Sequence, residues 1–121
     1  FRAARHNLAI VQLRQGKTTE AVATLDKALA ADPTLVRAWN ARAVAADRLK
    51  DWAGADAAYA RAIALAPDDA DVLTNRGYSL LLRERFTAAE MDLARAVAIA
   101  PQNSVARTNL RIARAMQGRY E

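Results

Sequence analysis

Residues 55–67 read ADAAYARAIALAP, and the same order of small residues, large residues and a closing proline recurs 34 positions earlier and 34 positions later. The earlier copy is AVATLDKALAADP at 21–33, and the later one is AEMDLARAVAIAP at 89–101. The matched columns are Ala21, Ala55 and Ala89; Leu25, Tyr59 and Leu93; Ala28, Ala62 and Ala96; and Pro33, Pro67 and Pro101. A fixed period of this length is typical of stacked helix pairs, which serve binding more often than catalysis.

Each unit is expected to hold two amphipathic helices joined by a tight turn. The predicted helices span 2–15, 18–31, 36–49, 52–65, 70–83, 86–99 and 104–117. Gly16 and Gly118 occupy the same turn position. Asp69 and Asn103 are the expected N-caps after their prolines, and Thr34 is the expected cap at the first junction. The sequence therefore predicts an all-α chain of three helix pairs and a seventh helix.

Composition excludes several kinds of function. The chain has no cysteine, so it cannot form disulfides, thiolate metal sites or a cysteine nucleophile. The net charge is +5, but both signs are scattered and no basic tract is interleaved with aromatic residues. Lys27, Arg61 and Arg95 share one repeat position on the second helices and are expected to face solvent. Nucleic acid is therefore not an expected partner.

A catalytic site is not indicated either. His6 is the only histidine, and no Ser or Asp lies at a spacing that marks a triad. Asp68, Asp69 and Asp71 lie at a helix start, where carboxylates favour the helix dipole, so they are not interpreted as a metal cluster. Four glycines in total cannot supply a phosphate loop, and no cofactor is expected.

The repeated residues resemble the tetratricopeptide repeat (TPR) family over essentially the whole chain. Ala9, Ala43 and Gly77 meet the family's small residue on the first helix, and Trp52, Phe86 and Tyr120 meet the aromatic residue that opens the second. The resemblance implies a right-handed superhelical solenoid that forms one domain over 1–121. Its repeats are expected at about 2–35, 36–69, 70–103 and, in part, 104–121. It also implies that the first helix of each pair lines a concave surface.

Charged residues replace apolar ones at one repeat position. The family's buried leucine is Leu8 in the first unit but Arg42 and Arg76 in the next two. An unpaired buried charge costs several kcal/mol, so each arginine is expected to find a carboxylate within its own repeat. Asp56 is the expected partner of Arg42. Glu90 and Asp92 are rival partners of Arg76.

Projection of the first helices onto the concave side gives a candidate peptide-binding groove. A row of polar side chains beside a row of apolar ones suits an extended peptide, because Asn both donates to and accepts from a peptide backbone. Arginines lie near the expected acidic end of such a ligand. The candidate groove residues are His6, Asn7, Ile10, Arg14, Arg37, Asn40, Val44, Arg48, Asn75, Tyr78, Asn109 and Ile112. The alternative interpretation is that these asparagines follow the family consensus and bind only water.

Chaperone-binding TPR modules hold an acidic C-terminus with a clamp of Lys, Asn and Arg. Only Asn75 and Asn109 fit that pattern here, while Ile10, Ala41 and Val44 depart from it. A chaperone tail is therefore not the expected ligand.

A finer resemblance to Flp-type (tight-adherence) bacterial pilus assembly TPR proteins is carried by the run TNRGYSLLL at 74–82 and by NLRIA at 109–113. It implies a non-enzymatic scaffold in pilus or secretion assembly, at the periplasm or outer membrane. The alternative is a substrate-recruiting arm of a larger enzyme, such as a glycosyltransferase or sulfotransferase. Outside the pilus interpretation, a cytoplasmic location is expected.

The chain begins at Phe1 without methionine, so it is expected to be a piece of a longer protein, with a lipid anchor upstream under the pilus interpretation. No membrane contact is expected of this fragment. Apolar side chains around the seventh helix predict self-association through the C-terminal end.

Overall fold

Seven α-helices and no strand form the described part of the chain, which is residues 2–118 of a computed structural model, with side chains described from residue 7 onward. The helices are α1 (Arg2–Arg14), α2 (Thr18–Ala31), α3 (Val36–Arg48), α4 (Trp52–Leu65), α5 (Ala70–Leu82), α6 (Phe86–Ile99) and α7 (Ser104–Ala115). The predicted all-α class and the seven helices are confirmed.

The turns inside each helix pair require left-handed backbone. Gly16 and Gly118 have φ of 77° and 80°, as their shared position predicts, and glycine adopts this conformation without a steric penalty. The equivalent residues in the middle units are Lys50 and Glu84, both at φ 58°. Each turn begins before its left-handed residue, so α1, α3 and α5 each end one residue earlier than predicted.

Side chains cap three of the helix starts. Asp69 accepts from the backbone N–H groups of Asp71 and Val72, and Asn103 accepts from that of Ala106, as predicted. Asp51 caps α4 in the same way. The prediction for Thr34 is wrong: the N-cap of α3 is Leu35, and the Thr34 hydroxyl donates to Asp32 instead. Leu35 is the residue that aligns with Asp69, so the cap position in this junction holds an apolar residue.

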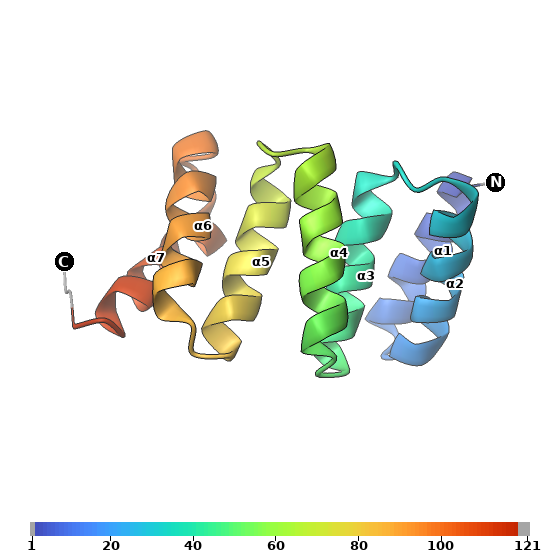
Figure 1. The fold of residues 1–121 in the computed structure, drawn as a ribbon, viewed down its shortest axis with the longest axis horizontal. Helices are drawn as coiled ribbons and strands as arrows, with labels where there is room; N and C mark the ends of the chain where they lie inside the picture. The colour runs from blue at the N-terminus through green and yellow to red at the C-terminus, as the bar shows by residue number, and fades with distance from the viewer. Residues whose placement is uncertain (1, 119–121) are drawn as a thin grey trace. The chain divides into compact units, whose positions relative to one another are not determined.

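The chain divides into two compact units, Phe1–Pro67 and Asp68–Glu121. In the first unit α1 packs on α2, α2 on α3 and α3 on α4, and α1 also touches α3 directly. In the second unit α5 packs on α6 and α6 on α7, and α5 touches α7 (Figure 1). Each unit therefore brings its first-of-pair helices side by side. The expectation that residues 1–121 form a single domain stays a prediction.

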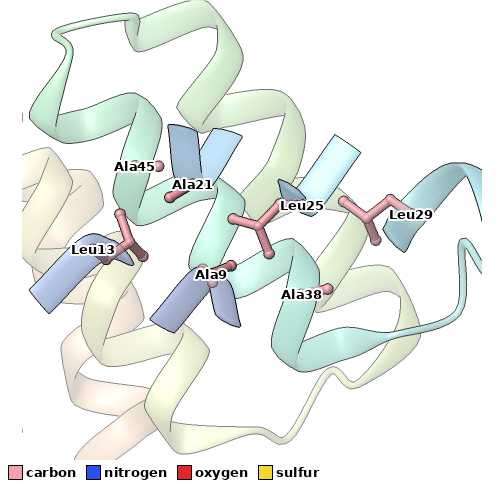
Figure 2. Packing of buried hydrophobic residues seen from close by; sticks show 8 residues of the cluster. Ala9, Leu13, Ala21, Leu25, Leu29, Ala38 and Ala45 are labelled. Atoms are coloured by element: carbon pink, nitrogen blue, oxygen red, sulfur yellow. The ribbon is translucent and has the colours of Figure 1, made fainter. Parts of the chain in front are cut away.

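Small residues on the first helices let large ones on the second helices approach closely. In the first unit Ala9 and Leu25 are fully buried in one cluster (Figure 2). In the second unit the equivalent residues are Gly77 and Leu93, and a Cβ added to Gly77 would lie 2.5 Å from the Leu93 Cγ. No room remains there for a side chain, so the small column sets the distance between the paired helices.

The arginines in the leucine position do find carboxylates, but not as a uniform set. Arg76 donates to Asp92 through Nε and Nη2 at 2.6 and 2.8 Å, so the rival pairing with Asp92 is confirmed. Glu90 accepts from Arg114 of the next helix. Arg42 donates to Asp26, which lies on the preceding helix rather than in its own repeat.

These two arginine pairs differ in burial, and this difference predicts unequal contributions to stability. Asp92 is 7% exposed, whereas the side chain of Asp26 is 57% exposed. Asp92→Ala leaves the Arg76 guanidinium half-buried without this partner, so we expect the free energy of unfolding to fall by about 2–3 kcal/mol. Asp26→Ala should cost less than about 1 kcal/mol, because water screens the attraction between the exposed Asp26 carboxylate and Arg42. Urea denaturation measures both; equal losses would contradict the assignment.

Candidate functional site

The first unit gathers its candidate residues on α1 and α3, which are in contact. We call this set the unit-1 face: Asn7, Ile10, Arg14, Arg37, Asn40, Val44 and Arg48. Ile10 and Val44 are half-buried, and the three arginines are exposed. His6 lies in α1, but its side chain is outside the described residues. No carboxylate belongs to the set, so the unit-1 face is basic with an apolar centre.

Arg48 is held in place by the neighbouring helix. Its Nη1 donates to the backbone carbonyl of Leu13 at 2.7 Å, close to the C-terminal end of α1. This bond joins α3 to α1 and orients the guanidinium. Arg14 makes no hydrogen bond or ion pair within the described part of the chain, so its five donors are available to a ligand. The sequence did not indicate the bond to Leu13, because a backbone acceptor leaves no trace in side-chain patterns.

The second unit places its candidates on α5 and α7, which are also in contact. We call Asn75, Tyr78, Asn109 and Ile112 the unit-2 face. Tyr78 is 51% exposed and Ile112 is 45% exposed, so both side chains offer apolar area at the surface. The set contains no Asp, Glu, Lys, Arg or His. The unit-2 face therefore offers apolar area with amide groups, in contrast to the basic unit-1 face.

Asn109 is the most informative of these residues. It is only 8% exposed, and its side-chain amide has no hydrogen-bond partner among the described residues. The residue at the same position in the first unit is Ala41, which is 5% exposed and needs none. Because buried polar groups are nearly always hydrogen-bonded, an amide in this place calls for a ligand or an ordered water.

The outward column on the second helices is engaged within each unit. Arg61 lies over the Trp39 ring at 5.3 Å from its centroid, and Arg95 pairs with Asp68 at 2.6 Å. All three basic residues of the column are exposed, as predicted, and each of them has an interaction within the chain. The contacts of Arg61 and Arg95 therefore stabilise the local structure, and Asp68 is the ion-pair partner of Arg95.

The described residues contain no group of three or more His, Asp or Glu side chains close enough to hold a metal ion. None of the helices within residues 2–118 has the length and apolar character needed to cross a membrane.

The sequence pattern of the family described as "Tetratricopeptide repeat" matches residues 6–70 and 40–104. No curated protein matches the chain closely enough to serve as a relative. Solved structures do: pilF of Pseudomonas aeruginosa is 30% identical with a TM-score of 0.91, over 97% of this chain and 54% of that one. PilW, described as a widely conserved type IV pilus biogenesis factor, is 28% identical with a TM-score of 0.89, over 97% and 55%. The chain thus spans about half the length of both.

The first TPR domain of RPAP3, solved with the HSP90 peptide SRMEEVD, is 26% identical with a TM-score of 0.91, over 97% of this chain and 93% of that one. An O-GlcNAc transferase from Thermobaculum terrenum is 20% identical, which shows the shared fold alone.

The unpaired amide predicts an unusual mutational outcome. Asn109→Ala removes a buried polar group that lacks a partner and restores the residue type of Ala41, so the free energy of unfolding should stay the same or rise by up to about 1 kcal/mol. Chemical denaturation of the free protein measures it. A loss of about 1 kcal/mol or more would show that the amide is structural, bound to an ordered water, and would contradict a role in ligand binding.

Proposed function

The chain belongs to the tetratricopeptide repeat family, and we propose that it is a non-enzymatic interaction module that binds a segment of a partner protein on the faces of its first-of-pair helices. The observation that carries this proposal is the buried Asn109 amide with no partner in the described residues. An extended peptide backbone presents both a donor and an acceptor, which is what an Asn side chain needs.

The unit-2 face also supplies the apolar surface that a peptide-binding site needs beside its polar groups. Tyr78 and Ile112 each leave about half of their surface exposed beside Asn75 and Asn109. Aromatic and aliphatic side chains next to convergent polar groups favour burial of a ligand side chain while the amides hold its backbone. We therefore assign apolar ligand residues to the unit-2 face.

The unit-1 face favours a different ligand chemistry. Its arginines are exposed, and Arg14 has no partner within the described residues. Guanidinium groups bind carboxylates through paired hydrogen bonds, which are stronger than neutral ones. We assign acidic ligand residues to the unit-1 face, with Ile10 and Val44 as its apolar centre.

The structural relatives support a peptide ligand. The first TPR domain of RPAP3 binds SRMEEVD, a peptide that contains both apolar and acidic residues. The chain shares that domain's fold but not the full set of charged clamp residues, since Ile10, Ala41 and Val44 stand at clamp positions. We therefore propose an apolar and acidic segment other than a chaperone tail.

The cellular role we propose is pilus or secretion assembly in a bacterium. Support comes from the likeness to pilF and PilW, the second of which is a type IV pilus biogenesis factor. The Flp-type system indicated by the runs at 74–82 and 109–113 is the finer form of this proposal. The alternative role, as the recruiting arm of a larger enzyme, has no supporting contact in the described residues.

Site-specific photocrosslinking in the intact protein tests the proposal. A benzophenone amino acid in place of Tyr78 should form adducts with a partner protein, and Asn109→Ala should reduce their yield by at least about tenfold. Mass spectrometry of the adduct then identifies the partner, and a pilus or secretion component is the expected result.

Met91 of α6 provides the matched control, because it is 71% exposed and therefore more accessible than Tyr78. The same amino acid at position 91 should give no adduct with that partner. Adducts of equal yield from positions 78 and 91 would contradict binding on the unit-2 face. So would an adduct yield at position 78 that Asn109→Ala leaves unchanged.

A further inference from the structure

At one repeat position the outer face of α7 differs from the matching face of every earlier first-of-pair helix. In α1, α3 and α5 this face packs on the following helix through Ala9, Ala43 and Gly77, all of which are buried. The equivalent residue of α7 is Arg111, which is exposed. One turn earlier, Leu73 of α5 is 2% exposed, whereas its α7 equivalent is the exposed Arg107.

Two consequences follow from these replacements. A helix without carboxylates at the contact cannot cover α7 in the way that α6 covers α5, because it would bury two guanidinium groups without partners at a cost of several kcal/mol. In addition, Arg107 and Arg111 lie one turn apart, where like charges repel each other. Neither has an ion-pair partner among the described residues. An anionic partner would relieve both effects.

The same face contains a hollow of about 190 Å³ between α6 and α7. Leu110, which is 7% exposed, and the half-buried Val97 give it apolar walls, and Arg107 and Arg111 line it as well. Arg114 also lines the hollow, but its Nε donates to Glu90 of α6 at 3.2 Å. The hollow therefore combines an apolar surface with two cations that have no ion-pair partner in the described part of the chain.

We propose that this arginine face of α7 (Arg107, Leu110 and Arg111, with Val97 of α6) docks an amphipathic helix of a partner protein that carries two carboxylates one turn apart beside an apolar side chain. The carboxylates pair with Arg107 and Arg111, and the apolar side chain enters the hollow. A helix lies readily in the groove between two packed helices, which fixes the spacing of its anchors.

Charge complementarity selects this occupant over a second copy of the chain. End-to-end stacking would bring α1 of one copy to α7 of the other. Residues 1–19 contain three arginines and one lysine but no carboxylate, so the contact would place cations against cations. A symmetric contact of two α7 helices fails for the same reason. The self-association expected from the apolar residues of α7 is therefore opposed by its arginines.

The test uses a helical, alanine-based peptide of about 15 residues with Glu at positions i and i+4 and Leu at i+3. Fluorescence anisotropy should show saturable binding to the full chain, and the Gln analogue of the peptide should not bind. The double variant Arg107→Glu/Arg111→Glu should weaken binding by at least about tenfold. A peptide with Lys in place of Glu should bind this variant and not the unaltered chain.

Two further variants locate the peptide. Lys17→Glu, which alters an exposed charge in the first unit, should leave its affinity unchanged. Loss of binding in Arg14→Glu, with binding retained in the double variant, would place the peptide on the unit-1 face and overturn the proposal. So would no binding by the unaltered chain, no rescue by the Lys peptide, or a dimer in sedimentation velocity that the double variant abolishes.

Discussion

The contact between Gly77 and Leu93 shows the constraint on which the rest of the structure depends. A first-of-pair helix carries a residue with little or no side chain, and the following helix places a large side chain against it. This contact buries a large side chain of the second helix, so the helix pair holds together by local packing. Another face of each first-of-pair helix takes no part in this contact.

That unused face is where the two units differ in chemistry. Packing against the second helix fixes the small column, but it places few demands on residues such as Arg14 or Tyr78. The first unit presents exposed arginines, and the second presents apolar area with an amide that has no partner in the described residues. The separation between packed and exposed positions on one helix lets the same packing scheme carry surfaces of different chemistry.

The sequence predicted the helices well because period, proline and small-residue columns all report on local packing. It predicted the Asp69 and Asn103 caps for the same reason, and failed at Thr34 because α3 begins at Val36, which makes Leu35 the N-cap and leaves Thr34 one residue too early. Its prediction of Asp56 as the partner of Arg42 was wrong, because Asp26 of the preceding helix takes that place. For Arg76 it left Glu90 and Asp92 open, since an arginine can reach the helix before or after its own. Burial of Asn109 and the arginine face of α7 could not be read from one repeat; they appear only when equivalent positions are compared in three dimensions.

Replacement of Gly77 by leucine tests the packing constraint most directly, because two effects predict opposite signs. Helix propensity alone predicts that Gly77→Leu raises the free energy of unfolding by about 0.8 kcal/mol. Overpacking against Leu93 predicts a net fall of about 2 kcal/mol or more. Ala57→Leu, at an exposed position of α4, should change it little. Urea denaturation that shows a clear fall only for Gly77→Leu is the predicted result, and a rise for that variant would contradict the role of the small column.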